Sequence, residues 1–209
     1  MAGDHTASAI VDAEKEAAKM LFGLAIAISA IPLLLRLPAR PGGIVVDIAE
    51  FGFSFLILVS VWFGYWNVMS VLPMEDRFVV ALNIGLLFLV SIEPYLFYLN
   101  ITFDLLSHEA LLNAASIGYA LDMTGLMMVL ALFTHQLAME ERGLVPKEAL
   151  SRYKRLRDVL FLSAALFAMT ALPAFWAIKF LGQPVRFIFW FVPLIISSAR
   201  ILSERGFQE

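Results

Sequence analysis

The chain of 209 residues contains no cysteine, only three histidines and few charged side chains, 16% in all. The absence of cysteine excludes disulfides, thiolate metal sites and thiol catalysis. The sequence also lacks a glycine-rich phosphate loop, a His-Glu-x-x-His spacing and a Gly-x-Ser-x-Gly elbow, so no motif indicates a metal site, a cofactor or an enzyme. The net charge of −3 is small, and we expect no nucleic-acid partner.

Hydrophobic residues make up 61% of the chain, whereas soluble domains are about half apolar and about a quarter charged. A helix needs about 20 apolar residues to cross the ~30 Å hydrocarbon layer of a bilayer. The apolar runs of this chain are long and continuous, without the alternation of barrel strands. We therefore predict an all-α polytopic membrane protein with six transmembrane helices, roughly at Ala17–Leu35, Phe51–Leu72, Phe78–Leu99, Ala110–His135, Val159–Phe180 and Phe187–Leu202.

The first apolar run, "KMLFGLAIAISAIPLLLRL", is predicted to remain as a helix. A cleaved signal peptide would end in a small-x-small site, but this run continues into "LLLRLPARPGG". Its link to the second run, "RLPARPGG" at residues 36–43, is predicted to stay outside a helix. Residues 1–16 form a polar segment, and residues 17–209 form a single transmembrane domain because no loop is large enough to hold another.

Cationic side chains predict the orientation of the chain. An even number of spans places both termini on one side, and that side collects eleven of the 15 Lys and Arg residues. The other four are Arg36, Arg40, Lys179 and Arg186. By the positive-inside rule we expect both termini and the loop "EERGLVPKEALSRYKRLRD" in the cytoplasm.

Two carboxyl groups fall inside predicted spans, where polar side chains are costly and often functional. Glu93 precedes Pro94 in "LVSIEPYLF", and the alternative to a functional role is hydration near the outer interface. Asp122, in "GYALDMTGLMM", lies near mid-membrane. It would be protonated or paired across helices, or it would make a structural hydrogen bond to a neighbouring Ser or Asn.

Trp62 lies deeper in the second run than an interfacial aromatic belt requires, and its indole N–H needs an acceptor. Asn83, in the third run, is a candidate acceptor. Two polar side chains facing one another between adjacent helices would hold those helices together.

The second and third runs resemble prokaryotic members of the endolysosomal potassium channel family (transmembrane protein 175). The resemblance rests on "SFLILVSVWFGYWNVM" followed by "LNIGLLFLVSIEPYLF", with matching positions at Ser54, Phe55, Trp62, Asn83 and Pro94. It implies an inter-helix polar network that includes Ser54, Trp62 and Asn83.

The first run departs from the family pattern. Its stretch "GLAIAISAIPLLL" resembles the family's, but "EAAKMLF" lacks the Arg-x-x-x-Phe-Ser-Asp signature. The family's His-His pair after Trp is replaced by Tyr65 and Trp66. Either the contact between the first two helices has been rebuilt or the resemblance is false.

The resemblance implies a homotetramer in a prokaryotic-type plasma membrane, with a potassium-permeable pore lined by the first helix. Bulky side chains form one stripe of that helix, and small ones, Gly23, Ala27 and Ala30, form a second. Rings of branched apolar side chains can close a pore by excluding water. The alternative is that the bulky stripe faces lipid or the bundle core. The predicted pore-lining residues are Leu24, Ile28, Ile31 and Leu35.

Three functions therefore remain open. The first is a homo-oligomeric cation channel with a hydrophobic constriction. The second is a proton-coupled transporter that uses Asp122 and Glu93. The third is a non-conducting membrane subunit or scaffold, whose basic loop binds a partner or anionic lipid.

Overall fold

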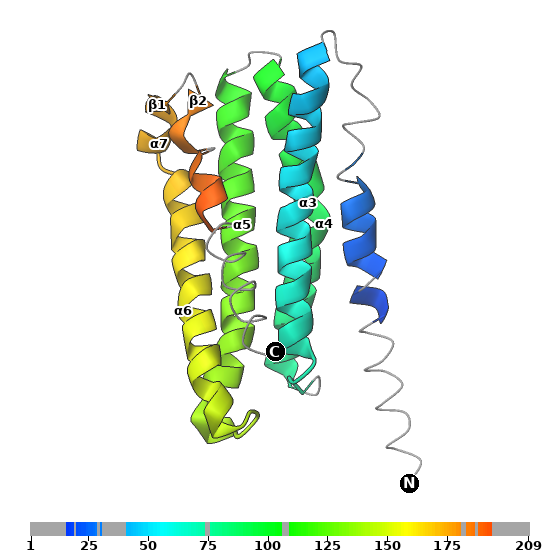
Figure 1. Ribbon diagram of the computed structural model, residues 1–209, viewed down its shortest axis with the longest axis vertical. Coiled ribbons are helices and arrows are strands. Elements are labelled where there is room, and N and C mark those ends of the chain that lie inside the picture. Colours follow the sequence, from blue (N-terminus) through cyan, green and yellow to red (C-terminus); the bar gives the residue numbers. More distant parts are fainter. Residues whose placement is uncertain are drawn as a thin grey trace.

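The chain forms a bundle of long helices that run side by side (Figure 1). It includes α3 (Pro41–Met69), α4 (Arg77–Leu105), α5 (Glu109–Ala138) and α6 (Lys147–Thr170), with a helical segment within residues 16–28 ahead of them. α5 packs against α3, α4 and α6 and therefore forms the centre of the bundle. The computed structural model describes residues 16–18, 20–28, 30, 41–73, 76–105, 109–180, 183–186 and 188–193.

Three described helices are long and apolar enough to cross a membrane: Phe51–Met69, Arg77–Asn100 and Glu109–Ala138. They correspond to the second, third and fourth runs, so these three predictions are confirmed as helices. Pro94 lies inside α4, because neighbouring helices can satisfy the backbone carbonyl that proline leaves without its usual partner. The second half of the first run and most of the sixth lie outside the described residues.

The predicted fifth span, Val159–Phe180, is wrong at its end. α6 begins at Lys147, directly after Pro146, and ends at Thr170. A turn follows, and Pro173 then precedes the short helix α7 (Ala174–Ala177). Proline has no backbone N–H with which to continue the α6 hydrogen bonds, so the apolar run is divided at this point.

Between the fifth and sixth apolar runs the chain forms a small antiparallel hairpin of β1 (Lys179–Phe180) and β2 (Gln183–Pro184). It lies at the upper end of the bundle in Figure 1, next to α7. The predicted linker at residues 36–43 ends earlier than expected, since α3 begins at Pro41 and contains Gly42 and Gly43. Proline is favoured in the first turn of a helix, where its missing N–H would have no intrahelical partner.

The first helix packs on the bundle through one face. Ala18, Phe22 and Ala25, spaced at helical intervals, are buried. The Phe22 ring lies 5.6 Å from the ring of Tyr65 on α3, and Tyr65 in turn lies 6.4 Å from Phe133 on α5. The contact between the first helix and α3 is therefore aromatic.

An ion pair joins two connections at the lower end of the bundle. Asp76 precedes α4 and accepts hydrogen bonds from the Arg142 guanidinium (2.9 Å) and the Phe78 backbone N–H (2.9 Å). Arg142 belongs to the short helix η1 (Glu140–Arg142) between α5 and α6, which ends at Gly143 in the left-handed conformation. The Asp76–Arg142 pair thus links the two connections. Both connections lie at the lower end of the bundle in Figure 1.

Candidate functional site

Glu93 occupies the centre of a buried polar cluster. Its side chain is 0% exposed. The Ser54 hydroxyl on α3 donates to Oε1 and Oε2 at 3.1 and 3.3 Å, and the Tyr119 hydroxyl on α5 donates to Oε1 at 3.5 Å. Glu93 therefore lies between three helices. The alternative interpretation of the sequence, hydration near the outer interface, is wrong.

Asp122 lies one turn after Tyr119 on α5 and is only 4% exposed. It is close enough to Glu93 for the two carboxyl groups to interact electrostatically. Neither Asp122 oxygen has a hydrogen-bond partner among the described residues, so the expected bond to a Ser or Asn is absent there. The two ionisable residues that the sequence singled out thus belong to one cluster.

The three polar residues that the resemblance implied are not joined to one another. Ser54 bonds Glu93. Asn83 is buried, yet its Oδ1 has no hydrogen-bond partner in the described part of the chain. Trp62 is partly buried against the core, with its ring 5.2 Å from that of Phe63.

Aromatic residues extend the cluster toward the upper end of the bundle. The Tyr119 ring lies 4.7 Å from the Trp190 ring. The Trp190 indole N–H donates to the Thr170 hydroxyl at 3.0 Å, and the Trp176 N–H donates to the Thr170 carbonyl at 3.3 Å. Thr170, the last residue of α6, therefore bonds both Trp176 of α7 and Trp190, whose ring contacts Tyr119 of α5.

Arg186, which the sequence placed among the four cations on the side opposite the termini, is buried at 1% exposure. Its Nη1 donates to Asn113 Oδ1 on α5 at 3.0 Å, and its guanidinium carbon lies 5.8 Å from the centre of the Trp176 ring. Stacking on an aromatic face and a neutral hydrogen-bond acceptor both suit a buried guanidinium.

Sequence reasoning missed four residues of this site: Tyr119, Asn100, Ser116 and Arg186. Asn100 on α4 donates to the Leu96 and Ala115 carbonyls at 2.8 and 3.3 Å, and Ser116 on α5 donates to Asn100 Oδ1. Tyr119 precedes Asp122 by three residues, and that helical spacing is a signal that could have linked the two. No group of His, Cys, Asp and Glu among the described residues could hold a metal ion.

The predicted pore-lining face belongs to the first helix. Leu24 is 56% and Ile28 is 37% exposed, and Gly23 and Ala27 are exposed beside them. Ile31 and Leu35 lie outside the described residues. Within one chain, therefore, Gly23, Leu24, Ala27 and Ile28 point away from the bundle, and the buried face is a third one.

No protein-family model matches this chain, and no curated protein matches it. Among solved structures it is similar to the crystal structure of a lysosomal potassium-selective channel TMEM175 homologue from Chamaesiphon minutus. The TM-score is 0.62 at 17% sequence identity, and the similarity covers 92% of this chain and 98% of the other. The resemblance drawn from the second and third runs is thus confirmed at the level of the fold.

Proposed function

We propose that the chain is a divergent member of the transmembrane protein 175 family and forms a potassium-permeable cation channel in a prokaryotic-type plasma membrane. The observation that carries this proposal is the shared fold, because it extends over nearly the whole of both chains. The three described membrane-crossing helices support it. A homotetramer around a central axis, with no cofactor and potassium as the permeant ion, completes the proposal.

The proposed constriction is formed by the exposed face of the first helix. Leu24 and Ile28 of each subunit would face the axis, with Ile31 and Leu35 continuing the stripe. A narrow ring of branched apolar side chains excludes water, and an ion stripped of water there meets a large desolvation cost. The exposure of Leu24 and Ile28 in the single chain leaves this face available to neighbouring subunits.

The test is cation flux from vesicles that contain the purified protein. Ile28→Ala should widen and wet the constriction and so raise potassium leak above that of the unsubstituted protein. Ile84→Ala is the matched control, because Ile84 is 65% exposed but belongs to α4 and not to the proposed constriction, and it should leave the leak unchanged. Equal leak from both variants and the parent protein would refute the proposed constriction.

A second candidate is a proton-coupled transporter, which the burial of Glu93 and Asp122 in one cluster favours. Intramembrane carboxyl groups without a cationic partner are typical of proton relays. Asp122→Asn should then abolish pH-driven uptake in vesicles while the protein still folds. A pH response that survives this substitution would eliminate the transporter.

A further inference from the structure

We infer that the outer face of α6 binds an anionic phospholipid at the membrane interface. α6 differs from α3, α4 and α5 because its first half, from Lys147 to Asp158, is highly charged and its second half, from Val159 to Thr170, is apolar. The change from charged to apolar residues within one straight helix marks the level at which a helix passes from headgroups into hydrocarbon.

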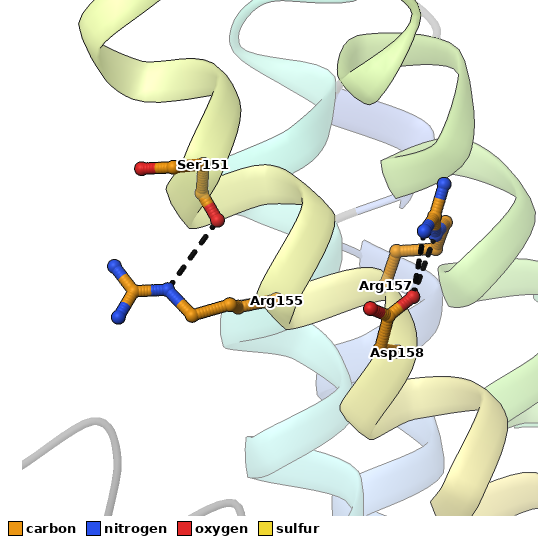
Figure 2. Close-up of polar contacts among 4 residues, drawn as sticks. All are labelled: Ser151, Arg155, Arg157 and Asp158. Atoms are coloured by element: carbon orange, nitrogen blue, oxygen red, sulfur yellow. Dashed lines mark hydrogen bonds and ion pairs between the residues drawn. The ribbon is translucent and has the colours of Figure 1, made fainter.

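The cations of this region are not equivalent. Arg142 is paired with Asp76, and Arg157 with Asp158 at 2.7 Å. Arg155 has no carboxylate partner among the described residues, and its Nε donates to the Ser151 carbonyl of its own helix at 3.4 Å. Figure 2 shows Arg155 and Ser151 on one side of α6 and the Arg157–Asp158 pair on the other. Arg155 is exposed, and no other hydrogen bond from its guanidinium to a described residue occupies the donors that an anion would use.

An apolar strip continues along the same face. Leu162 and Met169 follow Arg155 at intervals of seven residues, which is about two helical turns, so the three side chains lie nearly in line. Leu162 is 53% and Met169 is 45% exposed. Each step is about 10 Å along the helix, so the strip from Arg155 to Met169 covers about 20 Å, comparable to one leaflet.

The chemistry of this strip fits one occupant, an anionic phospholipid. The Arg155 guanidinium would pair with the phosphate, and the exposed Lys154 next to it would add a second positive charge. One acyl chain would lie along Leu162 and Met169. α6 packs against α5, which is long and apolar enough to cross a membrane. The exposed face of α6 would therefore meet lipid at this level whether or not the chain conducts ions.

The test is native mass spectrometry of the full chain from nanodiscs that mix phosphatidylglycerol with phosphatidylcholine. The unsubstituted protein should retain phosphatidylglycerol in preference to phosphatidylcholine. Arg155→Gln should lower that preference about fivefold, as expected for the loss of one cation near a membrane surface. Arg155→Lys should keep most of it, because the positive charge remains.

Lys147→Gln is the matched control. It removes the same charge from the same helix, about 12 Å farther from the apolar strip, and should leave the preference unchanged. Equal losses in the two variants would show an unspecific surface charge and would overturn the site. Displacement of the lipid by inorganic phosphate alone would also overturn the site. Dissociation of the Arg155→Gln oligomer without any change in lipid retention would overturn it too.

Discussion

Glu93 of α4 accepts hydrogen bonds from two hydroxyl groups, that of Ser54 on α3 and that of Tyr119 on α5. A hydrogen bond between membrane helices contributes about 0.6 kcal/mol on average, because the unfolded chain in the membrane also finds partners. The Ser54 hydroxyl contacts both carboxyl oxygens, so its removal leaves Glu93 with the longer bond from Tyr119.

At this scale we predict that Ser54→Ala lowers the free energy of unfolding in detergent by about 0.5–1.5 kcal/mol. Ser91→Ala is the control, since the exposed Ser91 hydroxyl donates only to the Leu87 carbonyl of its own helix. Its effect should be near zero in the same denaturation assay. A Ser54 variant as stable as the Ser91 variant would show that the contact with Glu93 contributes nothing.

The Asp76–Arg142 pair predicts a pH dependence at the lower end of the bundle. The hydrogen bond from Arg142, followed by that from the Phe78 N–H, lowers the pKa of Asp76 below its ordinary value of 3.8. A lowered folded-state pKa means that the pair stabilises the fold above that pH and that this contribution is lost as the pH falls through the lowered pKa. The stabilisation is small, because the pair is exposed to solvent.

The measurement is the thermal unfolding midpoint of the protein and of Asp76→Asn from neutral to acid pH. The midpoints should differ by a constant amount down to about pH 4 and converge only below it. Glu141→Gln, which alters an exposed carboxyl group of η1, serves as the control for acid effects elsewhere. Convergence well above pH 5 would contradict the assignment to Asp76.

At the scale of elements, the first helix is attached to the bundle by Phe22. Its ring is 1% exposed and contacts Tyr65 of α3. Lipid is as apolar as a phenyl ring, so burial from lipid adds little, and close packing supplies the stabilisation. The contact between Phe22 and Tyr65 therefore depends on how closely the two side chains fit together.

We predict that Phe22→Ala lowers the free energy of unfolding by about 1–3 kcal/mol, less than the roughly 3–5 kcal/mol of a water-soluble core. Met20→Ala, at a side chain that is 73% exposed two residues earlier, should cost little. Denaturation in mixed micelles, together with protease access to the first helix, measures both effects. A Phe22 variant that behaves like the Met20 variant would show that this helix is held elsewhere.

Sequence reasoning succeeded for elements whose signal is local. α3, α4 and α5 were predicted because each carries a long apolar run. The end of α6 was missed because the apolar run continues beyond Thr170 in sequence while the helix does not. Glu93 and Asp122 were identified from the sequence. The hydrogen bonds of Glu93 with Ser54 and Tyr119 depend on how three helices pack, which no local pattern contains.

At the scale of the whole molecule, two inter-helix connections lie at one end of the bundle. Most of the described lysines and arginines lie at or near these two connections. The turn before α4 and the connection between α5 and α6 meet there through Asp76 and Arg142. The hairpin of β1 and β2 lies at the opposite end (Figure 1). The charge asymmetry of the sequence thus corresponds to two different ends of the structure.

We predict that the end with the α5–α6 connection faces the cytoplasm, together with both termini, because that side carries most of the lysines and arginines. A cysteine introduced at Glu141 into this cysteine-free chain should be labelled by an impermeant reagent only in opened cells. A cysteine introduced at Lys179 should be labelled in intact cells. The reverse pattern would invert the orientation.

The aromatic contact between Phe22 and Tyr65 has a consequence for how the protein can respond to its surroundings. Neither ring carries a charge at neutral pH, so the contact offers nothing for dissolved ions to screen and no proton to gain or lose over that range. This ring contact should therefore be indifferent to salt and to moderate acidity. Any dependence of the stability of the protein on salt or on moderate acidity would have to arise from other contacts.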